Sequence, residues 1–357
     1  MWVADMDFLC PPAVIEALKK RVDHGIFGYA QEPPELRDII VDRLKRRYDW
    51  TIQPDWIAFP PNVFVGFHLA AHTTCKTGDG VAAHTPIYFP ILLVPPNVRL
   101  TGQLTEMLKA PNGRYEIDFD AFEASLDARS KLFILCNPHN PIGRVYTRSE
   151  LERIAEICLK HDLTICSDEI HADFVYDGRK HTPIASLSPE IGDRTITLFS
   201  PAKSFNVAGI TFSFAVIPSE DLRTKYEAAK QGLVTHPGVM GYTMAVPALR
   251  DSDAWFDELL AYLQENRDTA ARFVAEQIPG ISMTPLEGTY LAWLDCRSLV
   301  LDQTPHEFFL EKAKVATVEG AIFGTGGEGF ARLNLACPRP RLLEGLERIR
   351  QAVTAHS

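Results

Sequence analysis

The chain reads Thr195-Ile-Thr-Leu-Phe-Ser-Pro-Ala-Lys-Ser-Phe-Asn-Val-Ala-Gly209 where a short apolar run stops at a Ser-Pro turn. The run predicts a buried β-strand, and Lys203 follows it. Most lysines are solvated surface charges, but an ammonium group behind a buried strand is costly to desolvate. A lowered pKa makes its amine a usable nucleophile toward an aldehyde. Lys203 is therefore the first candidate for a catalytic residue.

Two more short apolar runs end in polar clusters upstream of this lysine. Residues 131–136 lead into Asn137-Pro-His-Asn-Pro-Ile-Gly143, and residues 163–166 lead into Ser167-Asp-Glu-Ile-His171. Residues 147–161 between them carry apolar side chains at helical spacing on one side and charges on the other. Strand, helix and strand in this order predict a parallel sheet, which binds ligands at the carboxyl ends of its strands. We therefore expect an α/β fold with a site at these strand ends.

Three side chains at the strand ends suit a flat pyridine aldehyde as cofactor. Asp168 can hold a pyridine nitrogen protonated, Asn140 can donate to a phenolate oxygen, and Lys203 can bond to the aldehyde carbon. Each residue alone has a plain structural alternative as a capping acid, a turn former or a surface amine. Their succession, each after an apolar run, favours the cofactor site.

Composition limits the possible partners and location. The 357 residues are enough for more than one domain, and no apolar run approaches the roughly 20 residues of a membrane span. The 46 acidic residues outnumber the 36 Lys and Arg residues, which argues against nucleic acid or an anionic membrane as partner. Seven cysteines without a C-x-x-C pair, and no signal peptide, predict a reduced cytoplasmic protein without a metal site.

A glycine-rich stretch near the C-terminus, Gly324-Thr-Gly-Gly-Glu-Gly329, matches the dinucleotide-binding fingerprint by letters alone. The fingerprint needs a following helix, but residues 330–335 alternate like a strand, so we reject it. We expect these glycines to let the backbone pass close to a bound substrate. Arg332 can then bind a carboxylate through two parallel hydrogen bonds, with a surface salt bridge as the alternative.

Six segments, in order along the chain, carry a resemblance to a known family. They are Trp2-Val-Ala-Asp-Met-Asp-Phe8, Phe27-Gly-Tyr29, Cys136-Asn-Pro-His-Asn-Pro-Ile-Gly143, Ser167-Asp-Glu-Ile-His-Ala-Asp173, residues 200–209 and Arg332-Leu-Asn-Leu-Ala-Cys-Pro-Arg339. The sequence resembles the class I/II aminotransferase superfamily of fold-type I pyridoxal-phosphate enzymes. Within it, the chain is most similar to the MalY/PatB branch of cystathionine β-lyases, or cysteine-S-conjugate C–S lyases.

The resemblance implies a fold and an assembly. A large α/β domain, residues 26–265, would hold pyridoxal 5'-phosphate on a mainly parallel, seven-stranded sheet. A smaller α+β domain would combine residues 1–25 with residues 266–357. Two such chains would form a homodimer with shared active sites.

The resemblance also implies roles for individual residues. The cofactor site would comprise Lys203, Asp168 on the pyridine nitrogen, Asn140 on the ring oxygen, Tyr88 stacked on the ring, His171, and Ser200 with the backbone of Val63 and Phe64 at the phosphate. Lys203 would be the Schiff-base lysine and proton shuttle, and Tyr29, the second catalytic residue, would reach the phosphate of the other subunit. Arg332 and Ala4 would bind the amino-acid substrate.

The implied function is a C–S β-lyase that cleaves L-cystathionine or related cysteine S-conjugates to pyruvate, ammonia and a thiol. A class I/II aminotransferase would use the same residues for the first proton transfer and is the alternative. A non-catalytic, cofactor-binding regulatory protein is a minor one, since no DNA-binding domain is visible. The sequence departs from the branch at Asn62, usually glycine, and at Ala202, usually serine, and it lacks a few dozen residues before Trp2.

Overall fold

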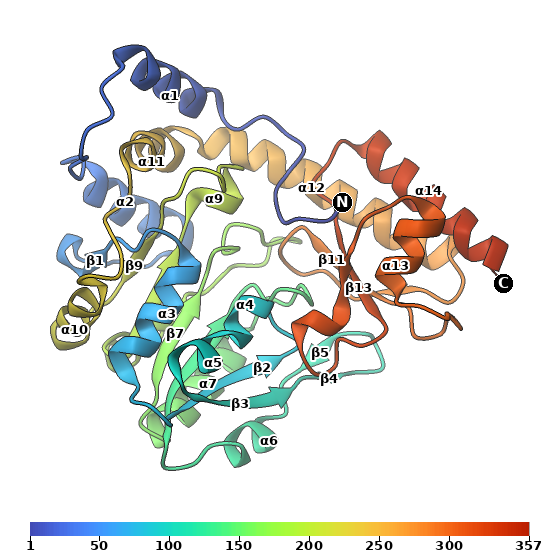
Figure 1. The fold of residues 1–357 in the computed structure, drawn as a ribbon, viewed down its shortest axis with the longest axis horizontal. Coiled ribbons are helices and arrows are strands. Elements are labelled where there is room, and N and C mark those ends of the chain that lie inside the picture. The colour runs from blue at the N-terminus through green and yellow to red at the C-terminus, as the bar shows by residue number, and fades with distance from the viewer. Residues whose placement is uncertain (357) are drawn as a thin grey trace.

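A seven-stranded sheet forms the centre of the larger of two units in the computed structural model, which describes residues 1–356 (Figure 1). The strand order is β1-β9-β8-β7-β6-β2-β3. The strands are β1 (Ile57–Ala58), β2 (Gly80–Thr85), β3 (Thr101–Glu106), β6 (Ser130–Cys136), β7 (Thr164–Asp168), β8 (Thr195–Phe199) and β9 (Phe214–Val216). All neighbours from β8 to β3 pair in parallel, and only β9 runs antiparallel to its neighbours. This confirms the predicted α/β class with a mainly parallel sheet.

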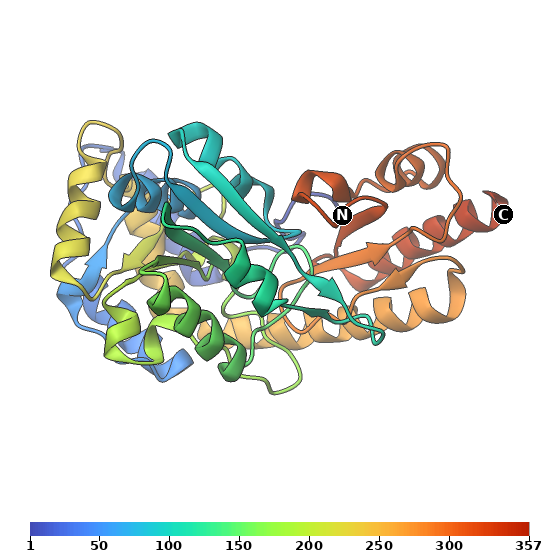
Figure 2. The same cartoon turned by 90° about the horizontal axis from the view of Figure 1, so that it is seen from below.

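Helices cover both faces of this sheet, as Figure 2 shows with α3 and α7 on opposite sides. Alternate residues of β6 face opposite ways: Leu132 and Ile134 pack with α3, and Phe133 and Leu135 pack with α7. The helices of the larger unit are α1 (Pro12–His24), α2 (Leu36–Tyr48), α3 (Val63–Thr74), α4 (Phe89–Leu92), α5 (Val94–Val98), α6 (Phe119–Ala124), α7 (Arg148–Lys160), α8 (Pro189–Gly192), α9 (Pro201–Ser204), α10 (Glu220–Lys230) and α11 (Val239–Asp251), with 3-10 turns Pro54–Trp56 and Ile184–Ser186. No helix in residues 1–356 has both the length and the apolar character of a membrane span.

The β6–α7–β7 unit aligns the strand ends that the sequence singled out. Thr147 begins α7 with a capping box to Glu150, and the helix buries its apolar face on the sheet. In the sheet register, Cys136 pairs with Asp168, and Asp168 pairs with Leu198. The carboxyl ends of β6, β7 and β8 therefore lie level at one edge of the sheet.

The smaller unit is built on a four-stranded antiparallel sheet in the order β10-β11-β13-β12. Its strands are β10 (Ser282–Met283), β11 (Leu291–Asp295), β12 (Val318–Glu319) and β13 (Phe330–Asn334), followed by α14 (Arg339–His356). Its short elements are α13 (Pro305–Phe308), the π-helical turn Phe309–Ala313 and the 3-10 helix Gly320–Phe323. A two-stranded hairpin, β4 (Leu108–Lys109) with β5 (Tyr115–Glu116), extends from the larger unit.

The two units share one long helix and the N-terminal segment. Helix α12 (Asp253–Gln277) runs without a break through the predicted boundary between residues 265 and 266 (Figure 1). Helix α1, expected in the smaller unit, packs against α11, and residues before it hydrogen-bond to β13. Lys314 ends the π-helical turn with a positive φ, and pairing with β13 begins at Val318.

Candidate active site

A cavity of about 390 Å³ opens at the carboxyl ends of β6, β7 and β8. Every site residue predicted from the sequence lines it except Tyr29: Ala4, Val63, Phe64, Tyr88, Asn140, Asp168, His171, Ser200, Lys203 and Arg332. The parallel sheet explains this collection, because residues far apart in sequence leave neighbouring strands at the same edge. The cavity therefore gathers nearly all the predicted groups into one place.

Lys203 lies on the short helix α9, which Ser200 caps by accepting a hydrogen bond from the Ala202 amide at 3.1 Å. The Lys203 Nζ donates to the Ala4 carbonyl oxygen at 2.6 Å. Burial, and then the nearby Arg332, lower the pKa of the Lys203 amine to about 8, against the opposing effects of Asp5 and Asp168. An amine with this pKa is partly neutral near physiological pH and can act as nucleophile or base.

Asp168 is the last residue of β7 and is 3% exposed. One of its oxygens accepts from the Ile170 amide at 3.1 Å. Burial raises the pKa of this carboxyl to about 7, while the Ile170 amide and Lys203 act in the opposite direction. A buried carboxylate with so few donors is suited to a cationic N–H group, which would supply the missing charge partner.

Arg332 on β13 has a buried guanidinium group, and within residues 1–356 its side-chain hydrogen bond goes to an amide oxygen and not to a carboxylate. Its Nη1 donates to the Asn140 side-chain oxygen at 3.0 Å, and its Nε is buried without an acceptor. Burial lowers the pKa of Arg332 to about 10, which still leaves the group charged at neutral pH. The alternative of a surface salt bridge is therefore wrong, and the group remains available to a substrate carboxylate.

The N-terminus of α3 forms a backbone cradle at the cavity wall. Asn62 caps this helix by accepting from the Val65 amide at 2.8 Å. The amides of Val63 and Phe64, at the first two helical positions, have no intrahelical acceptor and can bind an anion. Asn62 has an extended backbone with φ of −155°, so this position makes no demand for the glycine usual in the family.

Tyr88 and His171 complete the set around the cavity. Burial raises the pKa of Tyr88 to about 12, so its ring is a neutral phenol. Burial also lowers the pKa of His171 well below its ordinary value, and its Nδ1 has no hydrogen-bond partner. Together these groups fit a flat pyridine aldehyde that carries an anionic group. The Lys203 amine suits the aldehyde, the Asp168 carboxyl suits the ring nitrogen, and the helix amides suit the anion.

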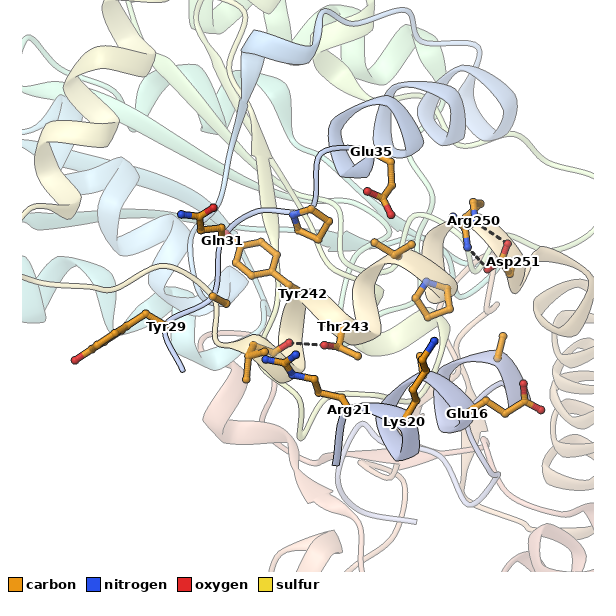
Figure 3. A pocket seen from close by; sticks show the side chains of 17 residues that line it. Glu16, Lys20, Arg21, Tyr29, Gln31, Glu35, Tyr242, Thr243, Arg250 and Asp251 are labelled. Atoms are coloured by element: carbon orange, nitrogen blue, oxygen red, sulfur yellow. Dashed lines mark hydrogen bonds and ion pairs between the residues drawn. The ribbon is translucent and has the colours of Figure 1, made fainter. Parts of the chain in front are cut away.

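Tyr29 lies elsewhere, between α1 and α2, with its side chain fully exposed. It borders a second, more open hollow of about 720 Å³ that α1, the segment before α2 and α11 enclose. Figure 3 shows the Tyr29 ring pointing away from the other side chains that line this hollow. One chain alone therefore does not bring Tyr29 to the cavity.

Sequence reasoning missed Tyr290, which bonds a residue of the cavity wall, and misplaced the glycine stretch. Tyr290 donates its hydroxyl to the Ala4 carbonyl at 2.9 Å, and no sequence pattern marked it. None of the glycines at 324–329 lines the cavity. Gly324 lies close to Thr85 and Leu92, and Gly326 lies close to Glu106, so these glycines serve packing between the units. The expectation that they border the substrate is therefore wrong for this cavity.

Known proteins are similar to this chain over nearly its whole length. Residues 3–349 match the family model "Aminotransferase class I and II". The chain is 39% identical to the cystathionine beta-lyase PatB of Bacillus subtilis (strain 168), with 99% of this chain and 92% of the relative covered. Among solved structures, cystalysin from Treponema denticola, which contains pyridoxal 5'-phosphate, has a TM-score of 0.95 at 36% identity, covering 100% and 91% of the two chains. A PLP-bound protein of Clostridium difficile 630, provisionally called an aminotransferase, has a TM-score of 0.96 at 37% identity, covering 99% and 92%.

Proposed function

The chain belongs to the class I and II aminotransferase family and uses pyridoxal 5'-phosphate, and within that family we propose that it is a carbon–sulfur β-lyase. Its proposed substrates are L-cystathionine or related cysteine S-conjugates, and its products are pyruvate, ammonia and a thiol. The observation that carries the proposal is one cavity that combines the poised amine of Lys203 with the unpaired Arg332. The full-length similarity to a cystathionine beta-lyase supports the choice of reaction.

The bound cofactor supplies an electron sink that stabilises negative charge at the substrate Cα. Arg332 would pair with the substrate carboxylate and so hold the Cα–H bond toward Lys203. The Lys203 amine would take the Cα proton, and Asp168 would keep a proton on the pyridine nitrogen. The Cβ–S bond would then break with its electron pair going to sulfur, and hydrolysis of the remaining three-carbon fragment would give pyruvate and ammonia.

An aminotransferase is the second candidate, because the family includes this reaction and the same three residues would start it. The two reactions diverge only after Lys203 has taken the proton. A non-catalytic regulatory protein would need neither a lysine of lowered pKa nor an unpaired guanidinium in the cofactor cavity, which argues against it. The seven cysteines are all free thiols, which supports the proposed cytoplasmic location.

Turnover of cystathionine without any keto acid separates the two reactions. We expect sustained release of pyruvate and homocysteine, because expulsion of a thiol from Cβ needs no second substrate. The measurement follows pyruvate and free thiol over many equivalents of enzyme. A single stoichiometric burst that leaves pyridoxamine phosphate, with turnover restored by 2-oxoglutarate, would instead establish an aminotransferase.

Mixing two site variants tests the proposed homodimer with shared sites. Tyr29→Phe should weaken cofactor retention if the exposed Tyr29 hydroxyl completes the partner's phosphate site. Mixing it with Lys203→Ala should give hybrid dimers with one doubly damaged site and one intact site. We expect activity to return to about a quarter of the wild-type value if chains exchange at random. If hybrid dimers form but stay inactive, Tyr29 does not act in the partner's site. It would then act within its own chain or have no role in cofactor binding.

A further inference from the structure

Residues 3–8 belong to no helix or strand, and the first two of them, Val3 and Ala4, line the cavity. Apolar burial in this segment is limited: Val3 is 53% exposed, Met6 is buried, and Ala4 and Phe8 are half-buried. Its attachment therefore depends on how its backbone groups are hydrogen-bonded. Two asparagine side chains supply five of those hydrogen bonds, and the Ala336 carbonyl accepts one more from the Asp7 amide at 2.9 Å.

Asn206 hydrogen-bonds to the second half of the segment. Its Oδ1 accepts from the Met6 amide at 3.0 Å, and its Nδ2 donates to the carbonyls of Met6 at 2.9 Å and Phe8 at 2.7 Å. The side-chain amide thus pairs with Met6 as a neighbouring strand would, and its one carbonyl and two N–H bonds are all used. Asn206 has a φ of +53°, a conformation that asparagine tolerates better than most residues.

Asn334 hydrogen-bonds to the first half of the segment in a similar way. Its Nδ2 donates to the carbonyls of Val3 at 2.5 Å and Asp5 at 2.6 Å, the peptide groups on either side of the Ala4 carbonyl. Its Oδ1 accepts from the Ala336 amide at 2.7 Å, which fixes the Asn334 side chain at the end of β13. The hydrogen bonds of Asn206 and Asn334 to residues 3–8 are called the two clamps below. The Ala4 carbonyl lies between these two sets of hydrogen bonds. It accepts from Lys203 Nζ at 2.6 Å and from the Tyr290 hydroxyl at 2.9 Å.

The two asparagines follow the two chemistry-bearing residues closely in sequence, Asn206 three residues after Lys203 and Asn334 two after Arg332. The elements that carry the amine and the guanidinium therefore also hold the wall between them. We propose that Asn206 and Asn334 are positioning residues that fix the Ala4 carbonyl as the acceptor for the Lys203 amine whenever that amine is not bonded to the cofactor. The inference rests on the proposed role of Lys203 as the cofactor-binding lysine.

A carbonyl oxygen accepts a hydrogen bond from an amine but takes no proton from it. The Ala4 carbonyl can therefore hold Lys203 in place without consuming the proton that the amine carries. When Lys203 turns to the cofactor, the Tyr290 hydroxyl still satisfies the carbonyl. Because Val3 and Ala4 line the cavity, the same clamps also fix the room left for a substrate.

The test measures hydrogen exchange of residues 3–8 in the cofactor-loaded protein, together with KM, kcat and the visible absorbance of the cofactor against pH. The clamp variants are Asn334→Ala and Asn206→Gly, since glycine keeps the positive φ that alanine would strain. We expect the Met6 amide to exchange roughly tenfold faster or more, since each lost hydrogen bond is worth about fivefold and each variant loses more than one. KM should rise about tenfold with a smaller change in kcat, and the absorbance titration should shift.

Asn266→Ala is the matched control, because Asn266 also donates Nδ2 to two backbone carbonyls, those of Leu335 and Cys337, but does not touch residues 3–8. It should leave the exchange of the Met6 amide, which bonds Asn206, unchanged. If a clamp variant fails to fold, aspartate at the same position keeps one acceptor oxygen and replaces the donor group by a second oxygen that repels the same carbonyls. Wild-type exchange in both clamp variants overturns the inference, as does faster exchange with unchanged KM and absorbance. If the wild type carries no cofactor on Lys203, the proposed function is refuted. The exchange data would still show whether Asn206 and Asn334 hold residues 3–8.

Discussion

Lys203→Ala is expected to lower turnover by more than about 10³-fold, because it removes both the cofactor-bonding amine and the proposed Cα base. The amine has no substitute in the cavity: the other cationic side chain that lines it is Arg332, whose pKa of about 10 leaves it charged at neutral pH. The variant should also lose the visible absorbance of the covalently attached cofactor while still folding.

Borohydride treatment of the wild type gives the direct measurement for this prediction. Reduction should fix the cofactor irreversibly on the peptide that contains Lys203, as mass spectrometry of a digest would show. Lys230→Ala is the matched control: Lys230 is also a buried lysine, but it pairs with Glu227 at 2.8 Å and lies on α10, outside the cavity. A labelled peptide without Lys203, or full turnover by Lys203→Ala, would refute the assignment.

Asp168→Asn is expected to lower kcat/KM by about 100-fold, because a neutral amide cannot stabilise a protonated pyridine nitrogen as a carboxylate does. A hydrogen bond to a charged group contributes roughly 1.5–3 kcal/mol, which corresponds to about 10- to 150-fold. Asp168 is 3% exposed, so little solvent screens this interaction. Cofactor affinity should fall together with the rate.

The pH dependence of cofactor binding gives this prediction a second measurement. Burial raises the pKa of Asp168 to about 7 in the protein without cofactor, so the carboxyl becomes protonated as the pH falls through 7. Only the charged form holds the pyridinium, so wild-type affinity should drop by about tenfold for each pH unit below 7. Asp168→Asn lacks this group, and subtracting its profile removes the titrations of the cofactor itself.

Glu169→Gln serves as the control for this experiment. Glu169 is a buried acid beside Asp168, but it bonds Ser167 at 2.9 Å and His181 at 2.8 Å and does not line the cavity. Its charge helps to raise the pKa of Asp168, so Glu169→Gln should keep a pH-dependent cofactor affinity with the midpoint moved to lower pH. Identical profiles for Asp168→Asn and the wild type would show that this carboxyl does not contact the pyridine nitrogen.

The sequence alone determined the strand ends and the residues that follow them. The apolar runs before Asn140, Asp168 and Lys203 each make a strand of the parallel sheet, and the register of that sheet brings their ends together. These predictions succeeded because strand formation and helix capping depend on residues a few positions apart. The parallel direction of the strands then follows from the helix between them.

Only the tertiary structure decided which groups are paired and which are free. The sequence left Arg332 undecided between a surface salt bridge and a carboxylate site, and burial beside Asn140 at 3.0 Å excluded the first. It did not indicate that residues 3–8 contact Asn206 and Asn334, or that α1 packs on α11. The contact between Lys203 and Ala4 joins residues 199 positions apart. Such contacts depend on how all the packed elements are placed in space, and local propensity carries no information about that placement.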